Sequence, residues 1–328
     1  MRLLATAPGG ARLDITPFYR SLTWSGSCRA CGRELQMELF NPRRELVGAK
    51  RPEVPVGTVV ELEEDGGGTL FYGMAVTVSQ DNESSVLSVN CLDNGRFLAR
   101  SEGWWDFRSI TAEDAARQIC RELGVEAGEL AATGVKLTRK FHGVAAYRAI
   151  ATLYTLAGEQ TQRRYAIGFE GRALTVRAKS EGVPELVIAP GANLMRQSTK
   201  VDVSKLYNQV DIYTQEGKLI RTVDDPESRA AYGSFRKLLT QAKGEDAGKE
   251  AQAALEDNGL AQTVTVECLG DTALVTGQTV ALVDALSGTA GRFWVDSDTH
   301  SWRKGVYTTK VELNFRNIMD SQTAGSEK

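Results

Sequence analysis

Hydrophobic and polar residues alternate in the N-terminal third of the chain, and this pattern predicts β-strands. Leu35-Gln-Met-Glu-Leu39 and Phe71-Tyr-Gly-Met-Ala-Val-Thr-Val78 show the two-residue period of half-buried strands. The glycines at 66–68 and Asp81-Asn82 interrupt this alternation as turns. Short strands that are broken this regularly are typical of a small barrel or sandwich, so we predict an all-β domain over residues 1–108.

The period changes to that of helices after Thr111-Ala-Glu-Asp114, which is related to the capping box that begins many helices. The apolar residues that follow at four-residue spacing are Ala115, Ile119 and Leu123. A second helix is expected over residues 144–157, and a strand hairpin that turns at Gly171 follows it. We therefore predict a compact α/β unit of two helices and a hairpin over residues 109–180.

Strand-like alternation returns in Leu206-Tyr-Asn-Gln-Val-Asp-Ile-Tyr213 and again in Thr263-Val-Thr-Val-Glu-Cys268. Between these segments, Asp225 and Pro226 have the character of an N-cap and a first helical residue. An apolar stripe at helical spacing comes next. The pattern predicts a helical insertion over residues 226–258 between two strands of one β domain.

The predicted fold class is α+β and mainly β. Two related small β-barrel domains flank the compact α/β unit, and the helical insertion interrupts the second barrel. That second barrel spans residues 181–225 and 259–318. Residues 319–328 are small and polar, so we expect them to form a flexible tail.

One strand-turn-strand pattern occurs in both predicted barrels. Gly57-x-x-Val-x-Leu62 recurs 220 positions later as Gly277-x-x-Val-x-Leu282. At Phe71 and Phe293 the offset is 222, a small slip that a turn can absorb. Two copies of one β-module suggest a part that is built for assembly.

Composition and charge exclude several functions. The 328 residues are 42% hydrophobic and 25% charged, as in a soluble globular protein of two or three domains. A net charge of −3 gives no reason to expect nucleic-acid binding. No stretch has the roughly 20 apolar residues that cross a bilayer, so no membrane insertion is expected. Because the N-terminus has no long apolar core, it does not resemble a signal peptide, and synthesis in a host cytoplasm is expected.

The cysteines and histidines do not form a recognisable metal, redox or cofactor motif. Cys28-x-x-Cys31 has the spacing of half a zinc site, but a structural zinc site needs four ligands and no second such pair exists. Five scattered cysteines also argue against a disulfide framework. We interpret the pair as packing or turn residues and expect no metal and no cofactor.

Two segments could carry catalysis or sugar binding. Asp296-Ser-Asp-Thr-His-Ser-Trp302 places carboxylates, hydroxyls and His300 in one expected loop, but no nucleophile-elbow motif accompanies it. Glu102 and Asp106 flank Trp104-Trp105, an arrangement compatible with a glycosidase or a sugar-binding cleft. We favour closure of the barrel or an interface at this second segment. The aromatic interface candidates are Trp104, Trp105 and Phe107.

The order of these parts resembles a known family of tail proteins. A β-module opens with an expected turn, Trp24-Ser-Gly26, and continues into Arg33-Glu-Leu-Gln-Met-Glu-Leu39. An α/β unit and Leu206-Tyr-Asn-Gln-Val210 follow. After the insertion, the chain ends with the second module and Gly305-Val-Tyr307. This order resembles the baseplate hub proteins of contractile phage tails and phage-tail-like bacteriocins, especially the tail-hub family of Gram-positive prophages. The hub part of type VI secretion spikes is more distantly similar.

The resemblance implies a homotrimer whose six barrels form a ring. Such a ring would meet the sixfold tail tube protein on one side and a threefold central spike protein on the other. The tape-measure protein and baseplate wedge proteins are further implied partners, and the implied location is the virion tail baseplate or a bacteriocin particle. No catalytic residues are implied, so the protein is expected not to be an enzyme. The polar residues Thr263, Thr265 and Glu267 are candidates for the channel wall.

The residues leave one alternative open, which is a tail-associated cell-wall hydrolase or carbohydrate-binding protein. It would use the Trp104-Trp105 region or the loop from Asp296 to His300. An oligomer of defined mass distinguishes the hub from this alternative, and turnover of peptidoglycan would favour the hydrolase.

Overall fold

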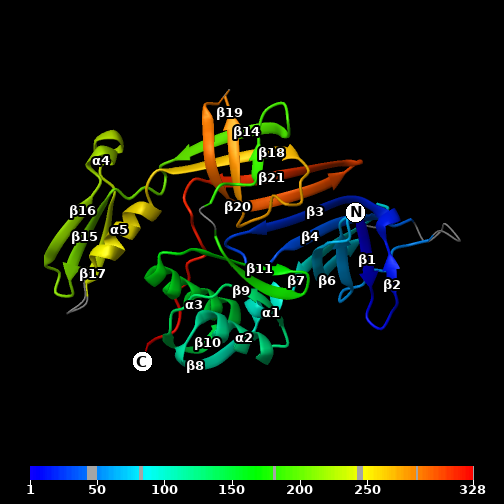
Figure 1. Cartoon of the computed structure of the whole chain (residues 1–328), viewed down its shortest axis with the longest axis horizontal. Helices are drawn as coiled ribbons and strands as arrows, with labels where there is room; N and C mark the ends of the chain where they lie inside the picture. Colours follow the sequence, from blue (N-terminus) through cyan, green and yellow to red (C-terminus); the bar gives the residue numbers. More distant parts are fainter. Residues whose placement is uncertain (43–49, 81–83, 180–181, 242–246, 286, 328) are drawn as a thin grey trace. The chain divides into compact units, whose positions relative to one another are not determined.

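The computed structural model describes residues 1–42, 50–80, 84–179, 182–241, 247–285 and 287–327 (Figure 1). Contacts between residues divide the chain into two compact units. The larger unit consists of Met1–Gln197 and Thr265–Lys328, and the smaller unit consists of Ser198–Val264. Strands far outnumber helices in the described residues, so the predicted mainly-β, α+β fold class is confirmed.

A mostly antiparallel sheet of thirteen strands dominates the fold. The N-terminal part of the chain supplies β1 (Arg2–Thr6), β2 (Arg12–Asp14), β3 (Tyr19–Ser27), β4 (Glu34–Phe40), β5 (Val59–Glu63), β6 (Thr69–Gln80) and β7 (Val86–Asp93). A short 3-10 helix, Thr16–Phe18, precedes β3. The C-terminal part supplies β13 (Leu186–Ile188), β14 (Leu194–Asp202), β18 (Ala261–Leu269), β19 (Thr279–Asp284), β20 (Thr289–Arg303) and β21 (Val306–Asn314).

The order of the strands shows that the two predicted β modules share one sheet. The order is β14-β18-β21-β20-β3-β4-β7-β6-β5-β1-β2, and β13 joins through β19 to β20. The strands of the first module are therefore continuous with those of the second, and the junction is the pair β3 and β20.

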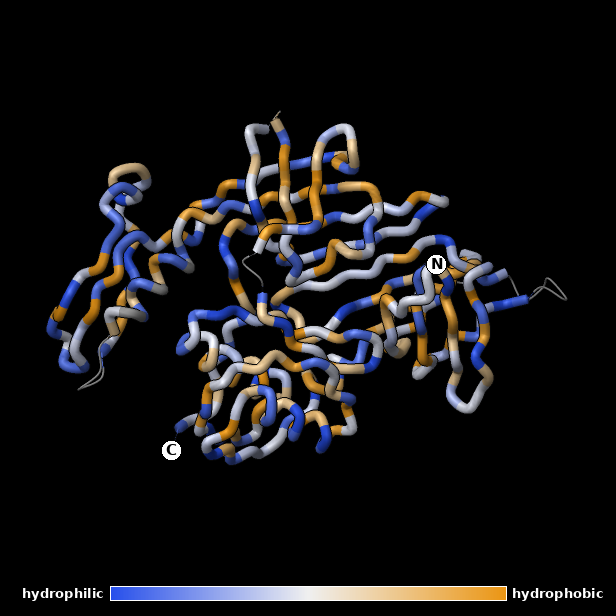
Figure 2. Tube along the Cα trace, viewed as in Figure 1, coloured by the Kyte–Doolittle hydropathy of each residue, from blue (hydrophilic) through white to orange (hydrophobic). Residues whose placement is uncertain are grey.

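Buried and more exposed residues alternate along the strands of the sheet, and Figure 2 colours each residue of the trace by its hydropathy. The buried residues of β4 are Leu35, Met37 and Leu39, and those of β18 are Val264, Val266 and Cys268. Because successive side chains of a strand point to opposite faces, this period buries apolar surface on one side only. The alternation predicted for both segments is confirmed.

The sequence repeat is also a structural repeat, because both copies begin with the same hydrogen bond. The Gly57 N–H donates to the Ala75 carbonyl at 2.9 Å, and the Gly277 N–H donates to the Val295 carbonyl at 2.9 Å. Both glycines have a φ of +91°, which residues with a Cβ rarely adopt. The turn that leads into β5 and into β19 therefore requires glycine.

The strand register corrects the predicted alignment of Phe71 with Phe293. Leu62 pairs with Phe71 in the first copy, but its counterpart Leu282 pairs with Gly291 in the second. The offset therefore remains 220 through the first two strands of each copy. The two phenylalanines are not equivalent residues.

The second and third strands of each copy show the same irregularity. A one-residue bulge follows Ala75 in β6 and Val295 in β20, 220 positions later. The offset becomes 222 in the third strand. Leu92 pairs with Met74 in the first copy, and Asn314 pairs with Trp294 in the second. The two-residue slip therefore lies in the connection between the second and third strands.

The segment after β7 combines helices and strands, and it begins before residue 109 and holds more strands than the predicted hairpin. It contains α1 (Gly95–Arg100), β8 (Glu102–Ile110), α2 (Ala112–Glu122), β9 (Glu126–Leu130), β10 (Leu137–Ala145), α3 (Ala146–Thr161), β11 (Tyr165–Glu170) and β12 (Ala173–Ala178). Thr111 caps α2 as predicted, because its hydroxyl accepts the Asp114 N–H at 3.3 Å. The predicted hairpin is confirmed as β11 and β12. In the described part of the chain, no helix is long and apolar enough to cross a membrane.

β8 does not close the first barrel as expected. It pairs with β10 in a separate two-stranded sheet and crosses the boundary predicted at residue 108. β8 belongs to the α/β unit, because its inward side chains pack in the same core as α2 and α3.

Residues 319–327 pack against the α/β unit, which corrects the predicted flexible tail. Ser326 and Lys140 exchange two backbone hydrogen bonds of 2.8 and 3.0 Å. Ala324 is part of the buried core. A Cβ on Gly325 would lie 2.2 Å from the Lys140 carbonyl oxygen, so the glycine permits this close approach. A small, polar composition reflected tight packing here and did not indicate disorder.

The smaller unit contains a sheet that is separate from the large one. Its elements are β15 (Gln209–Thr214), β16 (Leu219–Asp224), α4 (Pro226–Tyr232), β17 (Arg236–Gln241) and α5 (Gly248–Asp257), and the strand order is β16-β15-β17. Apolar residues of β15 and α5 form a small core. The strands predicted near residues 206–223 for the second barrel therefore pair in this unit.

The prediction of one helical insertion over residues 226–258 is wrong in its middle part. Asp225 caps α4 as predicted, since its carboxylate accepts the Ser228 N–H at 3.0 Å. Gly233, with φ +84°, then ends the helix after two turns. The next segment forms β17 and pairs in parallel with β15. Its two apolar residues, Leu238 and Leu239, are consecutive, and pairing with β15 decided its conformation.

Alanine at either repeat glycine is expected to destabilise the fold. The positive φ costs about 1–2 kcal/mol for a residue with a Cβ. Gly277→Ala should cost more than Gly57→Ala, because the new Cβ would lie 2.8 Å from Ala166 Cβ, whereas at Gly57 the nearest atom is Pro8 Cγ at 3.3 Å. Urea unfolding measures both. Gly168→Ala is the control, since open space surrounds that position, and equal stability of all three variants would contradict the prediction.

Candidate assembly interface

The two β modules are joined through a single strand pair. β3 and β20 pair antiparallel from Ser27 opposite Ser297 to Ser21 opposite Arg303. β19 pairs with residues 289–294 of the same strand, on the edge opposite β21. β3 and β19 therefore follow one another along one edge of β20, and β21 lies along the other edge (Figure 1).

A buried ion pair fastens this junction. Arg33 precedes β4, and its Nη1 donates to Asp298 Oδ1 at 3.0 Å while its Nη2 contacts Oδ2. The Asp298 side chain is fully buried, and that of Arg33 is 13% exposed. The backbone N–H and the hydroxyl of Thr276 also donate to Asp298 Oδ1, at 2.7 and 2.6 Å. Two-pronged, charge-assisted contacts of this kind are among the strongest hydrogen bonds in proteins.

Aromatic rings pack against the ion pair. The Arg33 guanidinium lies 3.9 Å from the centroid of the Trp24 ring, and the His300 ring lies 4.6 Å from the Trp24 ring. His300 Nε2 is 3.2 Å from Asp298 Oδ2, and its Nδ1 is 2.9 Å from the Tyr307 hydroxyl. Burial alone would raise the pKa of Asp298, but the contacts with His300 and Arg33 outweigh it and lower the pKa to about 2.

Two glycines and a buried carboxylate shape the turn that presents Arg33. Asp93 accepts the backbone N–H of Arg33 at 2.7 Å and that of Gly95 at 2.8 Å. A Cβ on Gly32 would lie 2.0 Å from Asp93 Oδ1, and one on Gly26 would lie 2.5 Å from Arg33 Nη1. Burial is the main reason that the pKa of Asp93 is raised to about 6. The glycines thus make room for the two charged groups.

Cys28 and Cys31 lie in the same turn, as free thiols. The Cys28 N–H donates to the Asp296 carbonyl at 2.8 Å, which ties the turn to β20. Burial raises the pKa of both thiols, that of Cys28 to about 11. Because the thiolate is the reactive form of cysteine, this environment suits packing rather than redox chemistry. No cluster of three metal-ligating side chains occurs within the described residues.

The repeat predicts a second junction of the same kind, at an edge where the described residues place no strand. β6 pairs with β5 over residues 69–74 and with β7 over residues 73–80, so residues 76–80 have one open edge. In β20, the residues 220 positions later carry β3 on that edge. Thr77, Ser79 and Gln80 are exposed. The sheet has a second open edge at β14. This strand ends the order of the described strands and has β18 as its neighbour.

β8 carries the three predicted aromatic interface residues but exposes only one of them. Trp104 is 75% exposed and stacks on His142, with the ring centroids 4.4 Å apart. Trp105 and Phe107 are buried in the core of the α/β unit, where Trp105 Nε1 donates to Glu122 at 2.9 Å. These two residues therefore stabilise the fold. Only Trp104 remains an interface candidate.

β18 carries the three polar candidates on its outer face. These half-buried residues are Thr263, Thr265 and Glu267. They alternate with residues that are buried on the other face of the strand. They belong to the large sheet and Trp104 belongs to the β8–β10 pair, so the two groups of candidates lie in different sheets.

The expected loop from Asp296 to His300 lies inside β20, which corrects its predicted conformation. Asp298 and His300 are both buried, and they contact Arg33 and Tyr307 as described above. Similarly, Trp24-Ser-Gly26 was expected to be a turn but lies within β3. The sequence did not indicate an ion pair between residues 265 positions apart. One sequence pattern could have indicated that these residues are buried. Asp298, His300 and Trp302 are spaced two residues apart, so they lie on the same face of a strand.

Solved structures of phage tail proteins share this fold. The 43 kDa tail protein of prophage MuSo2 from Shewanella oneidensis matches with a TM-score of 0.72 and 12% identity, over 96% of this chain and 98% of that chain. A tail protein from Neisseria meningitidis matches with a TM-score of 0.72 and 16% identity, over 98% and 99%. Prophage tail protein gp18 from Listeria monocytogenes gives 0.55 and 13%, over 97% and 96%. The chain therefore has a phage tail-protein fold, and the resemblance found in the sequence is confirmed at that level.

A family model described as YQBQ-like matches residues 22–314. The chain belongs to the YQBQ-like family. The matched range includes both copies of the repeat and the junction between β3 and β20. A search of curated proteins finds no match.

Asp298→Asn is expected to cost about 3–5 kcal/mol of folding free energy, because it leaves the buried Arg33 guanidinium without a counter-charge. Glu170→Gln is the matched control. It breaks the ion pair with Arg177, in which both side chains are more than half exposed, and such pairs contribute about 0–1 kcal/mol. Urea unfolding compares the two variants. Equal, small effects would show that the junction does not depend on the ion pair.

The stability of the fold is expected to change with pH in two opposite steps. Asp93 has a raised pKa of about 6, so its protonation favours the folded state and stability rises as the pH falls from about 6 to about 4. Asp298 has a lowered pKa of about 2, so its contribution is complete above about pH 4 and is lost as the pH falls toward 2. Urea unfolding at a series of pH values measures both steps. Asp93→Asn should remove the first step, and Asp298→Asn should remove the second.

Proposed function

We propose that this protein is a structural baseplate hub of a contractile tail. Three copies form a ring of six similar modules that joins the sixfold tail tube to the threefold central spike and surrounds the central channel. The observation that carries the proposal is the duplicated module, whose junction edge is occupied in the second copy and open in the first.

The repeat suggests how the ring closes. Inside one chain, β3 of the first module lies on the edge of β20 in the second. β14 has the position in the second module that β3 has in the first, because it pairs with β18 as β3 pairs with β4. β14 of one copy can therefore lie on the open edge of β6 in the next copy. Head-to-tail contacts of this kind form a ring when their rotation closes, and three copies give six junctions.

The surface of the open edges favours such a contact. Open edges expose N–H and C=O groups that can pair with another chain, and natural proteins normally cover or blunt them. The outer part of β14 is largely exposed and includes Met195, an apolar side chain that is 54% exposed. Pairing between copies would satisfy these backbone groups and cover this side chain.

The proposed partners follow from the hub role. They are the tail tube protein, the central spike protein, the tape-measure protein and baseplate wedge proteins. The virion tail baseplate, or the equivalent part of a bacteriocin particle, is the proposed location. Trp104 is proposed as a contact with one of these partners, and the polar face of β18 with Thr263, Thr265 and Glu267 as part of the channel wall.

The proposed role is not enzymatic. His300, the histidine that the alternative hydrolase would use, has no exposed surface and lies beside an Asp298 that is committed to Arg33. A catalytic base has to reach its substrate within hydrogen-bond distance, and a fully buried imidazole does not meet this condition. The structural role therefore accounts for these residues better.

Val78→Pro is expected to prevent ring formation while the chain still folds. The Asp296 carbonyl accepts a hydrogen bond from Cys28, which directly follows β3, so Asp298, two residues further along, turns its backbone toward the same edge. Val78 is its counterpart in β6 and faces the open edge, where no described strand pairs with it, so a proline there removes no hydrogen bond of the described sheet. Light scattering should give three times the 35.7 kDa chain mass for the wild type and one chain mass for the variant.

Val78→Thr is the control, because it keeps the N–H and a β-branched side chain. It is expected to assemble like the wild type, and circular dichroism should show that both variants are folded. A wild-type chain that remains monomeric together with the tube protein would refute the proposed hub. Normal assembly of folded Val78→Pro would refute the pairing of β14 with β6.

A further inference from the structure

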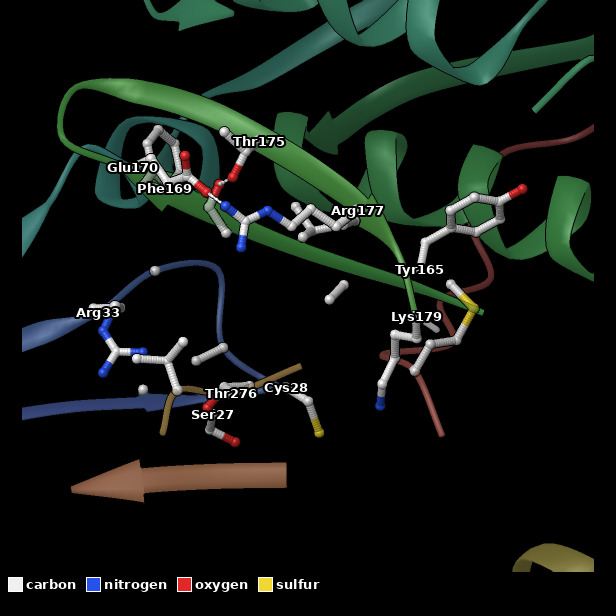
Figure 3. A pocket seen from close by; sticks show the side chains of 18 of the residues that line it. Ser27, Cys28, Arg33, Tyr165, Phe169, Glu170, Thr175, Arg177, Lys179 and Thr276 are labelled. Carbon is white, nitrogen blue, oxygen red and sulfur yellow. Dashed lines mark hydrogen bonds and ion pairs between the residues drawn. The ribbon is translucent and has the colours of Figure 1, made fainter. Parts of the chain in front are cut away.

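A cavity of about 270 Å³ lies in the larger unit, beside the junction of the two modules. Figure 3 shows the hairpin of β11 and β12 on one side of it, with Glu170 and Arg177, and the turn with Ser27 and Cys28 on the other. Thr276 and Lys179 complete the walls that the figure labels. Glu170 and Arg177 are exposed, so the cavity opens to the surface.

Two residues that line this cavity, Trp24 and Arg33, each have an N–H group without a hydrogen-bond acceptor among the described residues. These groups are Trp24 Nε1 and Arg33 Nε, and both are buried. Tyr165 also has a buried hydroxyl without a partner, but Figure 3 shows it directed away from the turn. An unpaired buried donor costs about 1–3 kcal/mol. Neither N–H has surface that water reaches, so an acceptor oxygen could bond to it only after the lining side chains move apart.

The lining also contains basic side chains, which favour an anionic occupant. The lining contains three basic residues, Arg33, Arg177 and Lys179, and one acidic residue, Glu170. Arg33 is already paired with Asp298 and Arg177 with Glu170, so Lys179 is the basic residue for which the described part of the chain shows no ion pair. Lys179 is 7% exposed, and its ammonium donates to the Ile318 carbonyl at 2.7 Å. Burial lowers the pKa of Lys179, although the nearby Asp296 opposes this shift. A carboxylate in the cavity would provide the counter-charge that a buried ammonium requires.

The backbone of one wall can bind an extended chain. β11 pairs only with β12 and is therefore an edge strand of its sheet, and all six of its residues line the cavity. Open space surrounds Gly168 at the middle of the strand. Addition of a strand to an exposed sheet edge is a common mode of peptide recognition. The apolar residues of the lining, which include Leu70, Ile167, Phe169 and Val275, can accept alternate side chains.

We propose that this cavity binds an extended acidic peptide segment of a partner protein, which adds to the edge of β11 and places a carboxylate near Lys179. Charge selects an acidic segment, and the edge strand with its apolar neighbours selects a peptide over a small anion. In a hub, the donor of the segment is another baseplate protein, so the identity of the partner rests on the proposed function. The site itself lies within one chain and does not depend on ring closure.

The test uses the full-length protein and two fluorescein-labelled hexapeptides, Val-Glu-Val-Glu-Val-Glu and Val-Gln-Val-Gln-Val-Gln. Fluorescence anisotropy should show binding of the acidic peptide with a Kd of about 1 mM or tighter, and at least about tenfold weaker binding of the glutamine peptide. Lys179→Met removes the charge but keeps an unbranched apolar side chain, and should weaken acidic-peptide binding about tenfold. Gly168→Trp fills the open space and should abolish it. Lys136→Met, at an exposed lysine outside the lining, should change nothing.

Several results would overturn the proposal. These are equal binding of the two peptides, unchanged binding in both cavity variants, and no acidic-peptide binding up to about 10 mM. Displacement by inorganic phosphate at the same concentration as the peptide would show a small-anion site instead. Light scattering separates this question from ring formation, because Lys179→Met and Gly168→Trp should assemble like the wild type.

Discussion

The pairing of β3 with β20, fastened by Arg33 and Asp298, is the constraint on which the large sheet depends. Without this strand pair the two modules would be separate sheets with an open edge each. Transfer of two charges out of water is costly, and their attraction repays the cost only when the geometry is good and the remaining polar atoms are bonded. Here Thr276 and His300 complete the shell of the carboxylate. The ion pair therefore selects one register of β3 on β20.

The residues around this ion pair leave space for it and hold its groups in place. Gly26 lies opposite Asp298 in the ladder, and its missing side chain leaves the space that the Arg33 guanidinium occupies. Trp24 covers the guanidinium, and Asp93 holds the backbone of the turn. Trp24, Gly26 and Arg33 also line the cavity next to the junction. These residues therefore contribute both to the junction between the modules and to the proposed peptide site.

The sequence predicted features that are local and missed those that depend on distant partners. The caps at Thr111 and Asp225 and the hairpin turn at Gly171 were identified because a few neighbouring residues determine them. The strand β17 was missed because parallel pairing with β15 stabilises it. Trp105 was assigned to an interface because aromatic composition does not distinguish buried from exposed positions, and this strand alternates between the two.

The two junctions of the proposed ring cannot be chemically identical, and the repeat indicates why. The positions in β6 that correspond to Asp298 and His300 of β20 are Val78 and Gln80. In the second module, moreover, the inserted unit separates β14 from β18, whereas in the first module the short turn with Arg33 connects β3 to β4. A buried ion pair suits a junction that forms once, when the chain folds. If the other edge also carried such a charge, a chain that has not yet assembled would hold that charge without its partner. A charge left buried without a partner costs about 3–5 kcal/mol. Neutral residues at that edge allow the free chain to be stable, and they leave the association of copies to backbone pairing and shape.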